Sequence, residues 1–234
     1  MEQAEYDLMD AQESRMWWYR ALHARLADAL AEVRGTVLDA GCGTGGFLAA
    51  LRAQRPDLHA VGLEFQPMAA ARAARKAATP VACASINAIP FADRSFDAAI
   101  SADVLCHEAV DPIAALAELR RVLRPGGLLV INLPAYAWLM SAHDRRVHNA
   151  RRHTAREVRA MLATAGFGTI RARYWNGLLL PLMVASRKLR RHDAASDVAA
   201  FPPWLDATLH GVTRLDRKLR LPMGSSILAT ATSP

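Results

Sequence analysis

Cysteine is scarce in this sequence, which has three cysteines among 234 residues. Cys42, Cys83 and Cys106 lie far apart and form no CxxC pair. Structural zinc sites and disulfide-stapled secreted domains need closely spaced sets of cysteines, so the sequence favours neither class. We therefore expect a reducing, cytoplasmic setting and no bound metal.

Long apolar runs are also missing. No stretch approaches the roughly 18 apolar residues of a membrane-spanning helix, and the acidic start at residues 1–5 is unlike a secretory signal. The composition, 52% hydrophobic and 22% charged, is typical of a soluble globular protein. We expect residues 1–234 to form a single domain with a full core.

Acidic residues are fewer than basic ones, 22 against 29, which gives a formal net charge of +7. Arginine is concentrated after residue 140. A basic surface attracts nucleic acid, anionic lipid or a phosphorylated substrate, whereas arginines on solvated helix faces need no partner. Composition leaves these interpretations open. No RNA-binding module accompanies the basic residues, so nucleic acid is disfavoured as a partner.

The chain does contain a regular alternation of strand and helix patterns. Strand patterns occupy an apolar run that ends at Asp39 and residues 59–64, 80–85, 96–102, 128–133, 169–174 and 225–232. Helical patterns occupy residues 8–33, 47–54, 68–76, 112–123 and 154–165. This alternation predicts a parallel, doubly wound α/β sheet that binds its ligand outside the carboxyl ends of the strands. An N-terminal helical segment, 1–33, and two insertions, 134–153 and 175–224, are additions to that plan.

A glycine-rich turn joins the first strand to the next helix. Glycines at 41, 43 and 45 allow positive φ and let a ligand approach the main chain, and the free N–H groups of the helix start favour a polar group nearby. Gly41, Gly43 and Gly46 also satisfy the dinucleotide pattern GxGxxG, so the turn alone leaves an NAD-linked oxidoreductase open. Asp39 argues against this alternative, because a carboxylate before the glycines repels a pyrophosphate and suits an ammonium group.

Three further stretches carry a more specific resemblance. Residues 37–45 resemble motif I of class I S-adenosylmethionine-dependent methyltransferases, 89–97 resemble the segment entering their fourth strand, and 121–127 the turn before their fifth. The three occur in order across roughly residues 35–133, and the chain is most similar to the ubiquinone/menaquinone-methyltransferase-like (type 11) group. The resemblance implies a Rossmann-like sheet of seven strands in the order 3-2-1-4-5-7-6, with strand 7 antiparallel. It also implies S-adenosyl-L-methionine as cofactor and a small molecule as methyl acceptor.

The resemblance assigns cofactor contacts residue by residue. Asp39 and the main chain of the glycine turn would hold the amino-acid part, Glu64 would bind the ribose hydroxyls, and Phe65 would lie beside the adenine. Ser85 and Ile86 would border the adenine, and Ala102 and Asp103 would lie under the methionine portion. The family commonly has Asp where this chain has Ser85. The full set of expected cofactor residues is Asp39, Gly41, Cys42, Gly43, Gly45, Glu64, Phe65, Ser85, Ile86, Ala102 and Asp103.

The two insertions are expected to form a lid over the cofactor, because both leave the carboxyl edge of the implied sheet. Histidine titrates near neutrality, so His143, His148 and His107 are candidates for deprotonating the acceptor. The candidate substrate-binding residues are Tyr19, Tyr136, Trp138, Asp144 and Arg152. The alternative for the first insertion is a surface loop whose Asp, Asn and Arg side chains bond one another.

The second insertion begins with an apolar stretch, 175–184, and then becomes basic at 187–191, with further cations at Arg214, Arg217, Lys218 and Arg220. Such a segment suits the wall of an apolar pocket or peripheral contact with a membrane, and equally a core-packed helix with a solvated end. We therefore predict a methyltransferase for a small molecule that is lipid-like, isoprenoid or phosphorylated. A cofactor-binding module without catalysis is an alternative. The oligomeric state is not predicted.

Overall fold

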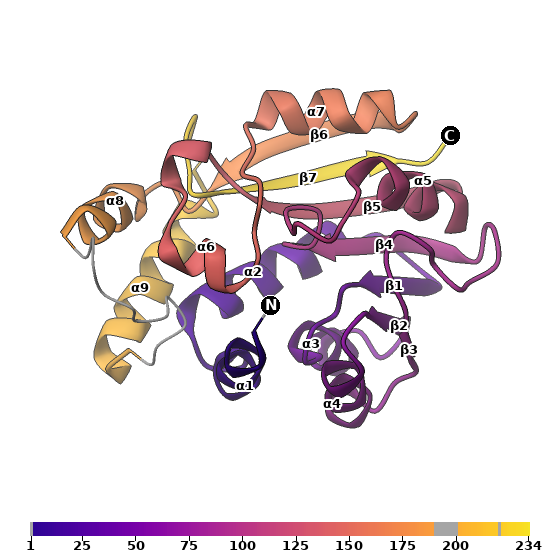
Figure 1. Cartoon of the computed structure of the whole chain (residues 1–234), viewed down its shortest axis with the longest axis horizontal. Coiled ribbons are helices and arrows are strands. Elements are labelled where there is room, and N and C mark those ends of the chain that lie inside the picture. Colours follow the sequence, from indigo (N-terminus) through magenta and orange to yellow (C-terminus); the bar gives the residue numbers. More distant parts are fainter. Residues whose placement is uncertain (1, 190–200, 220) are drawn as a thin grey trace.

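The computed structural model describes residues 2–189, 201–219 and 221–234 of the chain (Figure 1). Within these residues, seven strands form one sheet in the order β3-β2-β1-β4-β5-β7-β6. The strands are β1 (Thr36–Ala40), β2 (His59–Glu64), β3 (Val81–Cys83), β4 (Phe96–Ala102), β5 (Leu123–Pro134), β6 (Gly168–Trp175) and β7 (Ser226–Thr232). β7 runs antiparallel to β5 and β6, and the other described pairs are parallel. The predicted strand order and the direction of the last strand are confirmed.

Helices cover both faces of the sheet, as Figure 1 shows. One face carries α2 (Trp17–Ala29), α3 (Gly46–Gln54) and α4 (Pro67–Ala77), and the other carries α5 (Pro112–Val122) and α7 (Ala155–Thr164). The adjacent residues Val37 and Leu38 are both fully buried, the first in the cluster with α2 and the second in the cluster with α5. Successive side chains of a strand point to opposite faces, so a strand between two helical layers reads as an unbroken apolar run.

Local signals set several helix ends as the sequence predicts. Asp111 accepts the N–H of Ile113 at 2.9 Å and so caps α5. At the start of α7, Thr154 and Glu157 form a reciprocal capping box. Gly166 follows α7 with a φ of +83°. Helices commonly end at a residue in this left-handed conformation, which glycine adopts most easily.

The predicted single helix over 8–33 is wrong. The chain forms α1 (Gln3–Gln12) and α2, separated by a turn in which Met16 is extended, with φ −65° and ψ 134°. α2 restarts at Trp17, whose N–H donates to the carboxylate of Asp206 at 2.7 Å. The partner that caps this restart lies 189 residues away, so the helical periodicity of the segment contained no sign of the break.

Two predicted strands have other limits. β3 is shorter than 80–85, whereas β5 begins at Leu123 and includes the expected turn over 124–127. This turn is drawn into the sheet because Leu123 pairs with Phe96, and Gly126 and Gly127 exchange main-chain hydrogen bonds with Ser233.

Both insertions leave from the carboxyl edge of the sheet. Pro134 at the end of β5 and Trp175 at the end of β6 both pair with Ser226 at the start of β7. The first insertion contains η1 (Ala137–Leu139) and α6 (Ala142–Arg146), and the second contains α8 (Leu180–Leu189) and α9 (Pro203–Asp216). Helices α6, α8 and α9 lie together at the left of Figure 1. Of the predicted basic residues, Arg190, Arg191 and Arg220 lie outside the described residues.

Candidate active site

Ends of neighbouring strands meet at the carboxyl edge of the sheet, and they carry many of the predicted cofactor residues. β1 ends with Asp39 and Ala40, β2 with Glu64 and β4 with Ala102. Ala40 is in register with Leu63, so the ends of β1 and β2 lie side by side. A ligand at this edge can reach residues of three strands at once.

The glycine turn after β1 is held tightly and has no room for side chains. The N–H groups of Gly41 and Cys42 both donate to the carbonyl of Leu63, at 2.7 and 3.0 Å. Gly45 has a φ of +89°, and a Cβ at this position would lie 2.6 Å from the Cα of Ala73. The turn therefore needs glycine for its backbone conformation and for its close approach to α4.

Asp39 is a buried carboxylate with no hydrogen-bond partner among the described residues. It is 3% exposed, and no group among the described residues donates a hydrogen bond to it. Burial, reinforced by the negative charges of Glu64 and Glu13, raises the pKa of Asp39 to about 7. A carboxylate in these surroundings is stabilised by a cation, and the described residues supply none.

Glu64, the predicted ribose-binding residue, is held by the protein itself. One carboxylate oxygen accepts the N–H of Gly43 at 2.9 Å, and the other accepts the N–H of Gln66 at 2.9 Å and the hydroxyl of Tyr6 at 3.2 Å. The hydroxyl of Tyr6 comes from α1, 58 residues away in sequence. Ribose binding by Glu64 stays a prediction.

Helix α1 covers the glycine turn, a feature that the sequence analysis missed. Met9 packs against Gly43. Glu13, just after α1, accepts the hydroxyl of Thr44 at 2.8 Å and forms an ion pair with Lys76 of α4. At its other side α1 is tied to the first insertion by Glu5, whose carboxylate lies 3.0 Å from Nε of Arg146. These pairs join residues far apart in sequence, and no local pattern marks them.

Asp103 follows β4 in a left-handed conformation, with φ +56°. The side-chain N–H groups of Asn132 donate to its two carboxylate oxygens at 3.0 and 3.1 Å. Burial raises the pKa of Asp103 to about 7, although Asn132 and Arg152 act in the opposite direction. Burial, together with the negative charges of Glu13, Asp103 and Glu5, raises the pKa of the Tyr19 hydroxyl on α2. The residue after Asp103, Val104, lies against Gly41, so Asp103 is beside the glycine turn.

The predicted adenine residues lie at the ends of β2 and β3. Phe65 is 69% exposed, whereas Ile86 is 5% exposed. The hydroxyl of Ser85 accepts the N–H of Asn87 at 3.2 Å and so stabilises the turn over residues 85–87. Its own O–H can still donate to another group. Asn87 is a residue that the sequence analysis did not name; its side chain joins this turn to Ala109.

The three candidate histidines do not gather around Asp103. His148 is bonded to Glu108 at 2.7 Å on the surface, and Nδ1 of His143 lies 3.9 Å from the carboxylate of Glu5. His107 is partly buried, and its ring contacts the main chain of residues 147 and 148; burial lowers its pKa. None of these contacts reaches the glycine turn. A catalytic role for the histidines stays a prediction that this geometry does not favour.

Asp144 and Arg152 form an internal ion pair. Asp144 has no exposed surface and receives two bonds of 3.0 Å from the guanidinium of Arg152, and it also caps α6 through Ser141. Direct binding of a substrate by Asp144 stays a prediction that this internal pairing does not favour. The alternative interpretation, in which the polar side chains of the insertion bond one another, describes this pair.

Tyr136 and Trp138 begin the first insertion as an aromatic stack with Tyr174 of β6. Tyr136 lies between Trp138, at 5.6 Å between ring centroids, and Tyr174, at 5.1 Å. Trp138, at one end of the stack, is 58% exposed. Tyr136 also has a φ of +56°, an unusual conformation for a bulky residue. The stack is a flat apolar surface at the carboxyl edge of the sheet.

Comparison with known proteins agrees with this geometry. Residues 38–131 match the family described as methyltransferase domain. The chain is 32% identical over 160 residues to malonyl-acyl-carrier-protein O-methyltransferase of Dechloromonas aromatica, a match that covers 64% of this chain and 59% of the relative. Residues 38–131 thus form a methyltransferase domain. S-Adenosylmethionine is its cofactor.

Solved structures with the same fold differ in the reactions they are named for. Geranyl diphosphate C-methyltransferase of Streptomyces coelicolor has a TM-score of 0.64 at 17% identity, covering 92% of this chain and 79% of its own. The 4+2 cyclase SpnF has a TM-score of 0.58 at 26% identity, covering 94% and 85%. The chain spans 59% or less of the length of the curated relatives that head the comparison.

The residues present fit this methyltransferase cofactor. Asp39 has no cation bonded to it among the described residues, and the ammonium of the amino-acid part would supply one. Among the residues that the structure describes, no group of three His, Cys, Asp or Glu side chains could hold a metal ion. No helix in the described ranges is long and apolar enough to cross a bilayer.

Proposed function

We propose that this chain transfers a methyl group from S-adenosylmethionine to a small molecule. The observation that carries the proposal is Asp39, a buried carboxylate that feels the negative charges of Glu64 and Glu13 and has no cation bonded to it among the described residues. A cofactor with an ammonium and a sulfonium group suits this acidic surrounding. An NAD-linked oxidoreductase, the alternative left by the glycine pattern, would need to place an anionic pyrophosphate beside the same carboxylates, which costs free energy.

The chain's own residues have distinct tasks in this reaction. When bound, the cofactor supplies an electrophilic methyl group on a positively charged sulfur. Asp39 and the main chain of Gly41 and Gly43 hold its amino-acid part, and Glu64 binds the ribose hydroxyls in place of Tyr6. Helix α1 covers the turn and excludes water, so that the acceptor meets the methyl group in a defined orientation.

The acceptor, as we propose it, has an apolar portion and an anionic group. Apolar side chains of the two insertions are unusually exposed: Trp138, Met140, Leu178, Leu182 and Met223 are 37–58% exposed. Such surface suits an apolar ligand. Arg214 and Lys218 are exposed cations of the second insertion. The Dechloromonas relative is named for a malonyl group on acyl-carrier protein, and the Streptomyces structure with the same fold for geranyl diphosphate; both acceptors carry negative charge. A lipid-like, isoprenoid or phosphorylated acceptor agrees with these features.

The fold alone does not decide between methyl transfer and cofactor binding without methyl transfer, since a protein named as a cyclase shares it. Two measurements separate the alternatives. Isothermal titration with S-adenosylmethionine, and with NAD as control, tests the ligand; binding of NAD alone would overturn the proposal. Incubation of the protein with methyl-labelled S-adenosylmethionine and a metabolite extract then tests transfer. Label in a small molecule that depends on the protein is the expected result, and its absence favours a binding module.

Peripheral contact with a membrane is a second part of the proposal. Trp204 is 71% exposed and Leu182 58% exposed on the helices of the second insertion, which also carries the exposed cations Arg214 and Lys218. Exposed Trp and Leu beside basic residues are typical of interfacial binding. Co-sedimentation with vesicles containing anionic lipid is expected at low salt and not with neutral vesicles; no sedimentation with either rules it out. The cytoplasmic setting is proposed as well, since Cys42, Cys83 and Cys106 are all free.

A further inference from the structure

Asp103 is fixed at both its main-chain and side-chain groups. Its N–H donates to the carbonyl of Asn132 at 2.9 Å, and its carbonyl accepts the thiol of Cys106 at 3.2 Å. A residue other than glycine held at φ +56° persists only where its surroundings enforce it, and such residues occur often at functional sites. The position of this carboxylate is therefore determined by the fold and not by a flexible loop.

Asn132 orients the Asp103 carboxylate, and Trp175 orients Asn132. The amide N–H groups of Asn132 contact both Asp103 oxygens, and the amide oxygen accepts the indole N–H of Trp175 at 2.8 Å. An indole nitrogen can only donate, so this bond fixes which end of the amide faces Asp103. Asn132 has no exposed surface and Trp175 is 5% exposed, so no water competes readily for these bonds.

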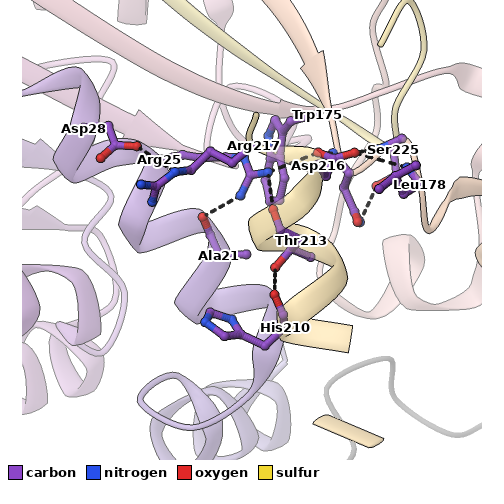
Figure 2. A network of polar contacts seen from close by, with 12 residues as sticks. Ala21, Arg25, Asp28, Trp175, Leu178, His210, Thr213, Asp216, Arg217 and Ser225 are labelled. Carbon is purple, nitrogen blue, oxygen red and sulfur yellow. Dashed lines mark hydrogen bonds and ion pairs between the residues drawn. The ribbon is translucent and has the colours of Figure 1, made fainter. Parts of the chain in front are cut away.

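Trp175 is in turn contacted by Arg25 of α2, which Asp216 of the second insertion holds in place (Figure 2). The guanidinium of Arg25 lies 4.5 Å from the centroid of the Trp175 ring, and it also bonds the carboxylate of Asp216 at 3.1 Å. Asp216 accepts the N–H groups of residues 176, 177 and 178 at 2.8–3.1 Å. A continuous set of buried contacts thus joins α2, β6 and α9 to the carboxylate that follows β4.

Among the residues that the structure describes, no cation is bonded to the Asp103 carboxylate, and the negative charge of Asp144 raises its pKa further. Arg152 lies near it but is bonded through two nitrogens to Asp144. The other titratable neighbours are the hydroxyl of Tyr19 and the thiol of Cys106, and burial raises the pKa of both. These surroundings agree with the raised pKa of Asp103, which is the value that suits a base acting at neutral pH.

We propose that Asp103 accepts the proton of the methyl acceptor, and that Asn132 and Trp175 are positioning residues that orient it. The inference rests on the proposed function and applies to an oxygen or nitrogen acceptor. The acceptor's lone pair forms the new bond to the methyl carbon while the carbon–sulfur bond breaks and its electron pair stays on sulfur. The acceptor's O–H or N–H bond also breaks, and its proton passes to a carboxylate oxygen of Asp103. The three histidines are not needed for this step.

Three variants test the proposal. Asp103→Asn removes the proton acceptor. Trp175→Phe keeps an aromatic ring for Arg25 but removes the indole N–H that orients Asn132. Trp17→Phe is the matched control, because the buried indole N–H of Trp17 has no partner among the described residues. For each protein we would measure binding of S-adenosylhomocysteine by calorimetry, the pH profile of label transfer into a metabolite extract, and the Asp103 titration by carboxyl carbon NMR.

The expected results differ between the variants. Asp103→Asn lowers label transfer by about 100-fold or more while the cofactor product still binds, since a positioned base typically contributes that factor. Trp175→Phe moves both the Asp103 titration and the acidic limb of the pH profile to higher pH, because a carboxylate that loses an oriented donor is harder to ionise. Asp103→Glu recovers part of the lost activity. Trp17→Phe changes none of these quantities.

Other outcomes separate the two proposals. Equal label transfer by Asp103→Asn and the unchanged protein would overturn the role of Asp103. An unshifted Asp103 titration in Trp175→Phe would overturn the positioning role of Asn132 and Trp175. If the unchanged protein binds S-adenosylhomocysteine but transfers no label to any extract, methyl transfer itself is refuted, and Asp103 has no proton to accept.

Discussion

Replacement of Asp39 by Asn should make the protein more stable and bind its cofactor more weakly. The reason is the same for both effects: Asp39 is 3% exposed, has no cation among the described residues, and has a pKa raised from 3.8 to about 7. The folded protein without cofactor therefore has to ionise a buried carboxylate that the unfolded chain ionises readily. A bound cationic ligand offsets the free energy of ionising Asp39. The Asn variant has no carboxylate to ionise and avoids this free energy with or without a ligand.

The magnitude follows from the pKa shift. The pKa of Asp39 is higher in the folded state by roughly three units, and one unit corresponds to about 1.36 kcal/mol, so ionisation destabilises the fold by about 4 kcal/mol. The sign is that of an acid whose pKa rises on folding. Stability is lost as the pH increases from about 4, where the unfolded chain begins to ionise, to about 7, and is constant above that. The Asn variant should lack this loss.

Urea unfolding of both proteins between pH 4 and pH 8, without cofactor, measures the effect. We expect Asp39→Asn to be more stable by up to about 4 kcal/mol at pH 8 and the difference to disappear towards pH 4. Calorimetry should show S-adenosylmethionine binding that is weaker by about 30-fold or more, as for the loss of one buried charge pair. Asp93→Asn, on the surface, is the control and should change stability by less than about 0.5 kcal/mol. A less stable Asp39→Asn protein at pH 8 would contradict the reasoning.

Three other substitutions test separate parts of the structure. Tyr6→Phe removes the hydroxyl that donates to the carboxylate of Glu64. Calorimetry should then show that S-adenosylmethionine binds equally well or up to about 10-fold more tightly. Clearly weaker binding would mean that Tyr6 contacts the cofactor itself. Asp216→Asn leaves Arg25 buried without a charged partner and should cost about 3–5 kcal/mol in urea unfolding, whereas an unchanged midpoint would refute the importance of this pair. Gly45→Ala should destabilise by about 1–3 kcal/mol because of its positive φ and its clash with α4. Its control, Gly211→Ala in an open helical position, should stabilise by up to about 1 kcal/mol in the same thermal melts, and equal melting shifts would count against the clash.

The sequence by itself determined the sheet and the glycine turn. Apolar runs, glycines and caps act through neighbouring residues, so they are readable from a short window: Asp111 caps the helix it precedes, and Thr154 bonds Glu157 three residues on. These local patterns did not give the strand order, which was predicted from the family resemblance. The single helix predicted over 8–33 failed because its break depends on Asp206, far along the chain.

Only the tertiary structure decided which polar groups bond one another. The hydroxyl of Tyr6 donates to Glu64, and the amide of Asn132 bonds both Asp103 and Trp175. The spacing of these residues in the sequence does not predict either contact. The histidines were candidates because of their chemistry, but their ring contacts are elsewhere. Helices and strands have short periods, so they leave a periodic pattern of apolar residues in the sequence. The partner of a buried side chain is set by how distant elements pack, and a single sequence carries no periodic trace of it.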